Sequence, residues 1–155
     1  WLRRSGAGVF WGDDHPLNAS TNQAGQAHTS PRAELLAIVI AIEQSRWPIH
    51  IFSDNQGYVT AVQRLLAGQY TPTLRDNRDL WKRIKERVLP TQKNFKINWV
   101  KGHAGEADIA KGNSSIAHQH GNNKADTLAN DGAKIVALPP ILLQAHQLRR
   151  RIILS

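Results

Sequence analysis

The sequence predicts an α/β fold in which a mixed sheet carries helices on its faces. Two features of the chain support this class. Short strands follow one another near the N-terminus, which is typical of antiparallel pairing, and later strands alternate with helices, which is typical of parallel pairing. The length of 155 residues suits one domain with its own hydrophobic core.

The first elements are expected to be two strands and a helix. Residues 7–11 read AGVFW, an apolar run typical of a strand, and a turn rich in Gly, Asp and Pro separates them from a second short strand that ends near Thr29. Residues 30–45 repeat apolar positions with the i, i+3, i+4, i+7 spacing of a helix. Ser30 suits the N-cap of this helix and Pro31 its first position.

The rest of the chain is expected to hold two strands and three helices in alternation. The strands are expected at 49–52 and 95–100, and the helices at 56–67, 78–88 and 122–134. In the second strand Phe95, Ile97 and Trp99 should share one face. The polar residues 102–121 are expected to form a long loop.

The composition points to an acidic partner and excludes thiol chemistry. The chain has 20 Lys and Arg against 12 Asp and Glu, a formal net charge of +8. Such a surface attracts polyanions such as nucleic acid, although a merely well-solvated surface has the same composition. The absence of cysteine excludes disulfides and thiolate metal sites. No apolar run approaches the roughly 20 residues of a membrane-spanning helix, so no membrane partner is expected.

Three acidic residues lie where folding alone would not place them. Glu34 lies in the first turn of its helix, where the helix dipole also favours an acid. Asp54 directly follows a strand, where ligand sites form in α/β sheets, although it could also cap the next helix. Asp126 lies beside the apolar face of the last helix, which is a poor place for a solvated charge. Together the three carboxylates predict one site.

A cluster of carboxylates indicates a cation site. Like charges repel one another, and bound cations stabilise them. Hard oxygen ligands suit Mg²⁺ or Mn²⁺, and two such ions can activate water and stabilise the leaving oxygen in phosphodiester hydrolysis. A basic protein with an acidic metal site has the features that a nuclease needs.

Histidines near this site have two possible roles. His103 follows a strand in a loop flanked by glycine, where it could move protons to and from a leaving group or simply lie at the surface. His118 and His120 form an H-x-H pair that would suit zinc. The lack of cysteine and the surrounding Gly, Asn and Ser residues disfavour that interpretation.

Several motifs in order resemble the type 1 ribonuclease H family. They are RAELLAIVIAIE, FSDNQGYV, NRDLW, WVKGHAG and GNNKADTLANDGAK. GVFWGDDHPLN is especially similar to the eukaryotic cellular members, and the resemblance runs from about Gly6 to Lys134. The order Glu, Asp, Asp also separates this family from integrases of the same fold, in which the glutamate comes late.

The resemblance implies a function and a site. It implies cleavage of the RNA strand of RNA–DNA hybrids by two Mg²⁺ ions, with Mn²⁺ as a substitute, held by four carboxylates on a mixed five-stranded sheet. Three of these carboxylates match Glu34, Asp54 and Asp126. His103 matches the mobile catalytic histidine, and Asn122 matches the asparagine before the last helix. Thr29 and Asn77 match residues that hold a phosphate of the DNA strand.

The chain also departs from the family pattern. The family's first carboxylate lies in a T-D-G motif on a first strand upstream of AGVF, and this sequence has no residue there. That strand and its aspartate are therefore expected to be absent, and Asp13 and Asp14 cannot substitute because they follow the strand. Ser30 belongs to a Thr-Ser-Pro segment where the family usually has T-N-Q or T-N-N. This difference changes the expected contacts to RNA 2′-hydroxyls. The tryptophan-rich basic segment of the cellular enzymes, known as the handle, is shortened here to AGQYTPTLR. Residues 106–120 lengthen the loop that holds His103.

The organisation and partners follow from these expectations. Residues 1–136 are expected to form the ribonuclease H-like domain and residues 137–155 a basic amphipathic extension. The chain is expected to be an intracellular monomer that binds RNA–DNA hybrid, in the nucleus, cytoplasm or mitochondrion. Two alternatives stay open: a relative that binds nucleic acid without cleaving it, and one domain of a retroelement-type polyprotein.

Overall fold

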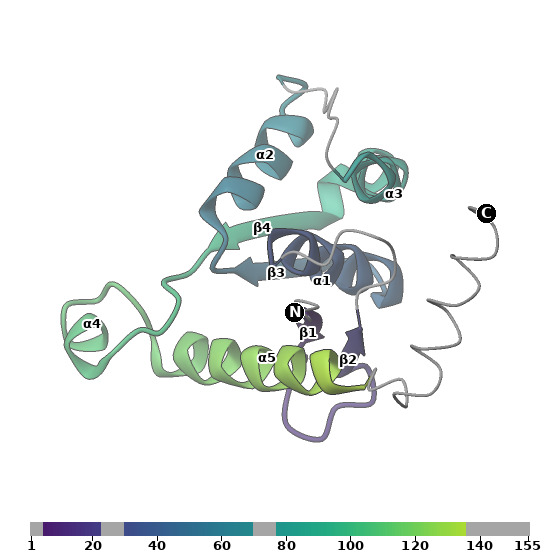
Figure 1. Cartoon of the computed structure of the whole chain (residues 1–155). Coiled ribbons are helices and arrows are strands. Elements are labelled where there is room, and N and C mark those ends of the chain that lie inside the picture. The colour runs from purple at the N-terminus through teal and green to yellow at the C-terminus, as the bar shows by residue number, and fades with distance from the viewer. Residues whose placement is uncertain (1–4, 23–29, 70–76, 136–155) are drawn as a thin grey trace, which may run out of the picture.

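Four strands form two separate pairs in the computed structural model, which describes residues 5–22, 30–69 and 77–135 (Figure 1). β1 (Gly6–Val9) pairs antiparallel with β2 (Ala19–Asn22). β3 (Ile49–Ser53) pairs parallel with β4 (Phe95–Trp99). One antiparallel and one parallel pair confirm the mixed α/β class that the order of elements predicts.

Helices lie on both sides of these strands. In Figure 1 the longest helix, α5, runs below the strands, α2 and α3 lie above them, and α4 projects at the left. The helices are α1 (Ser30–Gln44), α2 (Gln56–Leu66), α3 (Arg78–Val88), α4 (Glu106–Ala110) and α5 (Ile116–Lys134), with a 3₁₀ segment at Leu89–Asn94. No helix in the described ranges is both long and apolar enough to cross a membrane.

The hydrophobic core lies between α1, α2, α3 and the β3–β4 pair. Its largest fully buried side chains include Leu35 and Ile42 of α1 and Leu80 and Ile84 of α3. Burial of each such side chain contributes about 1.5–3 kcal/mol to folding. The same stripe that predicts α1 from the sequence therefore anchors it, and this fixes the position of Glu34 on its exposed side.

Helix α5 lies unusually close to the β1–β2 hairpin. A Cβ atom on Gly8 would lie 2.2 Å from the backbone oxygen of Ala125, and one on Gly132 would lie 2.4 Å from the oxygen of Thr21. Only glycine fits such an approach of backbone to backbone. The alternate residues of β1, Ala7 and Val9, are buried. The hairpin therefore presents its glycines to α5 and its apolar side chains to the opposite face.

The expected elements are confirmed with three corrections, apart from the end of the second strand near Thr29, which lies outside the described residues. Glu34 lies beyond the first turn of α1, because the helix already begins at Ser30. Trp99 is 45% exposed, so it does not share the buried environment of Phe95 and Ile97. The predicted loop at 102–121 instead contains α4 and the first turns of α5.

Local hydrogen bonds explain the helices in that polar segment. Ser115 caps α5 by accepting the His118 N–H at 3.1 Å, and Gln119 Nε2 donates to the Ala104 oxygen at 2.5 Å. Asp108 of α4 accepts hydrogen bonds from the Gly105 N–H and from Lys101 Nζ. Polar contacts rather than apolar packing hold these helices in place. The segment therefore has no apolar periodicity from which a helix could be predicted.

Candidate active site

A cleft of about 260 Å³ lies between the two strand pairs. Residues of β1, β3, α1 and α5 line it. The three acidic residues singled out in the sequence, Glu34, Asp54 and Asp126, all contribute to this lining although they come from three distant elements. The fold therefore brings the predicted carboxylates to one place.

Glu34 is oriented by a neighbour that the sequence did not single out. Asn55 donates a hydrogen bond from Nδ2 to Glu34 Oε2 at 2.5 Å. The Oδ1 atom of Asn55 accepts the Tyr58 N–H at 3.0 Å and so caps α2. Because the cap fixes which side of the amide is the acceptor, the donor side must face Glu34. An asparagine just before a helix predicts the cap, but nothing in the local sequence predicts the contact with Glu34.

Asp54 lies at the carboxyl end of β3, as the strand pattern predicts. The alternative role as N-cap falls to Asn55, so folding of α2 does not explain Asp54. Trp99 donates its indole N–H to the Asp54 backbone oxygen at 3.0 Å. A Cβ on Gly102 would lie 2.8 Å from Asp54 Oδ2. Trp99 therefore holds the backbone of Asp54, and Gly102 lies against its carboxylate.

Asp126 of α5 has a carboxyl group whose pKa is raised. The main cause is partial burial, and the negative charge of Asp54 raises the pKa further. His103 opposes these effects, since its Nδ1 lies 3.8 Å from Asp126 Oδ2. Asp54 and Asp126 thus share the cleft, and the charge of Asp54 contributes to the raised pKa of Asp126.

The position of His103 suits a group that can move. Its side chain is 83% exposed, and its backbone has φ of +49°, in the left-handed region that few residues other than glycine adopt. It follows Gly102, as the sequence indicates. His103 is thus an exposed residue next to Asp126, which lines the cleft.

The H-x-H pair does not form a zinc site in the described residues. His118 stacks on Phe52 with ring centroids 4.6 Å apart, and His120 contacts the ring of Phe10 and the carboxylate of Asp13. No group of three or more His, Asp or Glu side chains in 5–22, 30–69 and 77–135 converges tightly enough to hold a metal ion. This includes the three carboxylates, which share the cleft without forming one closed cluster.

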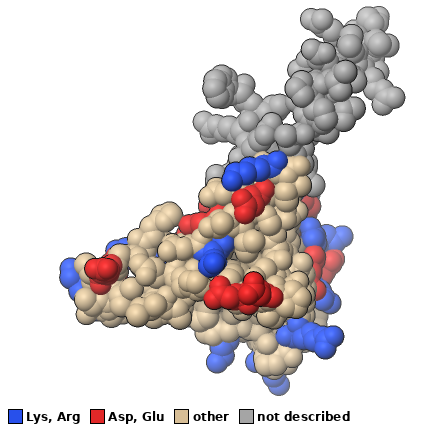
Figure 2. Space-filling model, turned by 90° about the horizontal axis from the view of Figure 1, so that it is seen from below, with Lys and Arg blue, Asp and Glu red and all other residues tan. Residues whose placement is uncertain are grey.

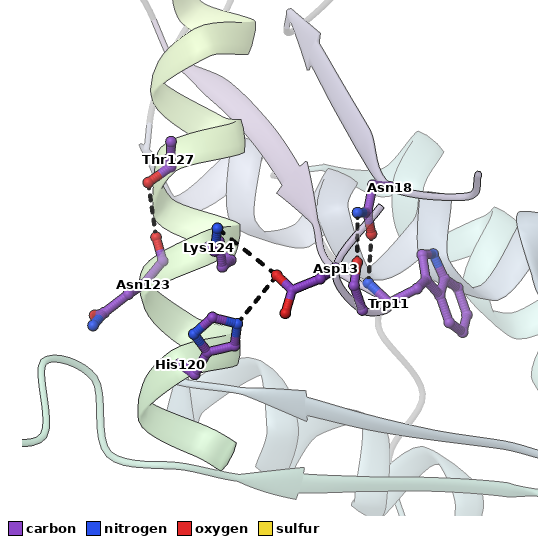
Figure 3. Close-up of polar contacts among 8 residues, drawn as sticks. Trp11, Asp13, Asn18, His120, Asn123, Lys124 and Thr127 are labelled. Atoms are coloured by element: carbon purple, nitrogen blue, oxygen red, sulfur yellow. Dashed lines mark hydrogen bonds and ion pairs between the residues drawn. The ribbon is translucent and has the colours of Figure 1, made fainter. Parts of the chain in front are cut away.

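Asp13 belongs to a bridge between the β1–β2 turn and α5 (Figure 3). Its Oδ1 lies 3.3 Å from His120 Nε2 and 3.8 Å from Lys124 Nζ. Asn18 stiffens the same turn, since it accepts the Trp11 N–H at 2.8 Å and donates to the Gly12 oxygen at 2.7 Å. These partners make Asp13 a contact between the β1–β2 turn and α5.

The four residues expected to bind substrate have different positions. Asn122 lines the cleft, and its Nδ2 is buried without a hydrogen-bond partner in the described part of the chain. Asn77 precedes α3 with φ of +60° and accepts a hydrogen bond from Arg32 Nη1 at 3.0 Å, which turns its donor side away from Arg32. Thr29 lies outside the described residues. Ser30 begins α1, and its side chain lies outside the described part of the structure.

The fold defines the class of protein. A solved structure entitled "Solution structure of PFV RNase H domain" superposes with a TM-score of 0.54 and 21% sequence identity, covering 84% of this chain and 91% of that one. This similarity establishes the ribonuclease H-like α/β fold, including its arrangement of strands and helices.

The sequence comparisons establish the family. The RNase H family model matches residues 2–134, and the chain belongs to the RNase H family. Ribonuclease H of Schizosaccharomyces pombe is 31% identical over 136 residues, covering 83% of this chain and 46% of the relative. Ribonuclease H of Desulforamulus reducens is 31% identical over 123 residues (72% and 67%), and human Ribonuclease H1 is 27% identical over 147 residues (84% and 44%). The chain thus spans about half the length of the fission yeast and human relatives.

Proposed function

We propose that this protein hydrolyses the RNA strand of RNA–DNA hybrids. The observation that carries the proposal is that Glu34, Asp54 and Asp126, from three separate elements, line one cleft in a member of the RNase H family. The fission yeast, bacterial and human relatives are ribonucleases H, which supports the same activity. Neither the cap of α2 nor the core explains these carboxylates.

The carboxylates suit divalent cations. The RNase H family depends on divalent metal, and this site offers oxygen ligands whose mutual repulsion a cation would relieve. We propose that Glu34, Asp54 and Asp126 hold two Mg²⁺ ions, with Mn²⁺ as a substitute. When bound, such ions activate water and stabilise charge on the leaving oxygen.

Other residues of the chain would position or transfer protons. Asn55 holds one oxygen of Glu34, while Trp99 and Gly102 hold Asp54. His103, exposed and close to Asp126, would donate a proton to the leaving oxygen. Free rotation at an exposed position lets the imidazole approach and leave the substrate.

We propose that a fourth carboxylate comes from a strand ahead of Trp1. Among the described residues, the acidic side chains that line the cleft are Glu34, Asp54 and Asp126. Asp13 pairs with His120 and Lys124, and Asp108 pairs with Lys101. A separate segment is therefore the simplest source of the remaining ligand.

We propose that contacts from several elements hold the substrate. Figure 2 shows basic and acidic side chains interspersed over the visible face, which is the side of α5 in Figure 1. Asn77 and Asn122 offer amide groups for phosphate and sugar oxygens. Thr29 and Ser30 are the other two residues that we propose to contact the substrate. Recognition of RNA would rest on its 2′-hydroxyls and on groove shape.

A second candidate function is nucleic-acid binding without cleavage. It is favoured by the finding that the carboxylates in the described ranges do not converge into a metal-holding group. Cleavage of a fluorophore-labelled RNA–DNA hybrid, measured over a range of Mg²⁺ and Mn²⁺ concentrations, separates the two functions. The chain should be tested with an upstream strand restored.

The matched variants for this assay are Asp54→Asn and Asp131→Asn. Asp131 forms an exposed ion pair with Lys134 and does not line the cleft. We expect Asp54→Asn to abolish cleavage without lowering the unfolding temperature, and Asp131→Asn to cleave normally. Hybrid binding with no cleavage at any metal concentration would establish the second function instead.

A further inference from the structure

We propose that residues 106–120 form a brace that fixes the backbone on both sides of His103. Asp108 of α4 and Gln119 of α5 are the positioning residues of this brace. Its effect on cleavage rests on the proposed function, in which His103 transfers a proton. The contacts of the brace are independent of substrate, so the two proposals can fail separately.

Asp108 holds the chain two residues before and two residues after His103. Its Oδ1 accepts a hydrogen bond from Lys101 Nζ at 2.5 Å, and its Oδ2 accepts the Gly105 N–H at 3.1 Å. The pKa of the Asp108 carboxyl is lowered, chiefly by the hydrogen bond from Lys101 and then by the one from Gly105, so both contacts favour its charged form. One carboxylate therefore bridges the two ends of the segment 101–105.

Gln119 holds the residue that directly follows His103. Its Nε2 donates to the Ala104 oxygen at 2.5 Å, and Ala104 is only 5% exposed. The carbonyl of a buried residue needs a donor, and here the donor comes from the first turns of α5. Ser115 caps these turns by accepting the His118 N–H, which fixes the place from which Gln119 reaches the loop.

The remaining neighbour of His103 has a contact on the side of the cleft. A Cβ on Gly102 would lie 2.8 Å from Asp54 Oδ2, so this glycine lies against a candidate metal ligand. The residues that flank His103, at 101–102 and 104–105, therefore all have contacts with other parts of the chain. The His103 side chain is 83% exposed, so its imidazole can rotate on a backbone that is held in place.

The backbone conformation of His103 explains why such support is needed. Its φ of +49° lies in the left-handed region, which is unfavourable for residues other than glycine. A residue keeps such a conformation only where its surroundings hold it. In this conformation His103 Nδ1 lies 3.8 Å from Asp126 Oδ2. Loss of the brace would let the backbone relax and turn the imidazole away from Asp126.

Capping of the helices does not explain all of these contacts. Asp108 accepts the Gly105 N–H at the start of α4, as a capping residue does, but a cap has no need of Lys101, which precedes His103. An exposed ion pair alone contributes little to stability. The contact of Gln119 is not a cap either, because Ser115 already caps α5. Support of the intervening segment accounts for both residues.

Matched alanine variants of the chain with an upstream strand restored test the contacts without metal or hybrid. Asp108→Ala is compared with Glu106→Ala, which removes the other carboxylate of α4, and Gln119→Ala with Asn130→Ala, an exposed position of α5. We expect the Gly105 amide to exchange at least about tenfold faster in Asp108→Ala than in Glu106→Ala. The carbonyl carbon resonance of Ala104 should shift in Gln119→Ala alone. Unchanged exchange and an unchanged resonance would overturn the proposal.

Single-turnover cleavage of a labelled hybrid tests whether the brace acts through the histidine. Asp108→Ala and Gln119→Ala should each lower the rate constant by about tenfold and change the half-saturating hybrid concentration by less than about twofold. Proton transfer depends on the position of the imidazole, whereas hybrid binding does not. Glu106→Ala and Asn130→Ala should change neither quantity.

A double-mutant cycle with His103→Ala is the decisive comparison. If Asp108 acts only through His103, Asp108→Ala should change the rate constant of the His103→Ala protein by no more than about twofold. An equal loss in both backgrounds would show that Asp108 acts elsewhere and would overturn the proposal. Gln119→Ala is taken through the same cycle, so the test stands on a second variant if Asp108→Ala does not fold.

The two sets of measurements separate this proposal from the proposed function. If the unsubstituted chain cleaves no hybrid but the Gly105 exchange and the Ala104 resonance respond as expected, the brace is correct and the proposed function is wrong. If the chain cleaves hybrid and both brace variants cleave at the normal rate, the proposed function is correct and the brace is wrong.

Discussion

Asn55 donates a hydrogen bond to Glu34 across 2.5 Å while its other amide atom caps α2 through the Tyr58 N–H. One side chain thus joins a candidate metal ligand on α1 to the junction of β3 and α2. The contact makes the orientation of Glu34 dependent on a residue that does not itself line the cleft. Asn55 is a positioning residue.

Replacement of Asn55 separates its two tasks. Asn55→Asp keeps an acceptor for the Tyr58 N–H but removes the donor to Glu34 and adds a like charge beside it. We expect hybrid cleavage by the strand-restored chain to fall by about tenfold or more, mostly through a higher Mg²⁺ requirement, while stability changes by less than about 1 kcal/mol.

The control for this variant is Ser115→Ala, which removes the cap of α5 without touching Glu34. It should cost about 1 kcal/mol of stability and leave the Mg²⁺ dependence unchanged. Equal effects of the two variants on Mg²⁺ dependence would show that Asn55 acts only as a cap.

Gly102 should be indispensable because it lies against the carboxylate of Asp54. A methyl group at this position would lie 2.8 Å from Asp54 Oδ2, whereas one at Gly105 would lie 4.0 Å from its nearest neighbour, Asp108 Oδ2. We expect Gly102→Ala to reduce cleavage strongly and Gly105→Ala to have little effect. Steady-state cleavage rates with unfolding curves for both variants provide the measurement. Normal activity of Gly102→Ala would show that Asp54 can shift without loss.

The raised pKa of Asp126 predicts a stability that depends on pH. A carboxyl whose pKa is higher in the folded state favours folding when protonated, and this contribution is lost as pH rises through the folded pKa. At neutral pH the charge of Asp126 therefore destabilises the fold. Asp126→Asn should raise the unfolding temperature by no more than a few degrees at pH 7, because the group is partly exposed.

The gain from Asp126→Asn should vanish below the ordinary aspartate pKa of about 3.9, where the native side chain is also neutral. Thermal unfolding of both proteins across pH tests this. A stabilisation that does not change with pH would indicate altered packing rather than charge. Saturating Mg²⁺ should reverse the sign by stabilising only the native protein.

Two glycines of α5 offer a matched test of how closely this helix approaches the hairpin. Gly132→Ala places a methyl group 2.4 Å from the Thr21 oxygen and should destabilise the protein by about 1–3 kcal/mol. Gly121→Ala meets only Phe10 Cδ1 at 3.8 Å, so the better helix propensity of alanine should stabilise the helix by up to about 1 kcal/mol. Chemical denaturation of both variants measures the difference. Similar effects would contradict the close packing of α5 on β2.

Much of the fold follows from local sequence patterns. The pattern at 78–88 predicts a helix with the observed bounds, because Leu80, Trp81, Ile84 and Val88 form one buried stripe. For α5 the sequence predicts a start six residues too late, at 122 instead of 116, because the first turns are held by Ser115 and by polar contacts. Polar anchoring leaves no periodic signal.

The site is predictable only in part, for a similar reason. Asp54 can be singled out because it ends a strand, and Asp126 because it borders an apolar face. The contacts of Asn55 with Glu34 and of Trp99 with Asp54 join residues far apart in the sequence, and no local pattern reveals them. The cleft itself depends on how two strand pairs and two helices are arranged, which only the tertiary structure shows.

The central claim is that Glu34, Asp54 and Asp126 form one metal-dependent site for cleavage of RNA–DNA hybrid. The most direct measurement is cleavage of a labelled hybrid by the strand-restored chain and its Glu34→Gln, Asp54→Asn and Asp126→Asn variants, with and without Mg²⁺. We expect Mg²⁺-dependent cleavage of the RNA strand, which each substitution abolishes in a protein that remains folded. Cleavage that persists in any of the three variants, or that is unaffected by removal of divalent metal, would contradict the claim.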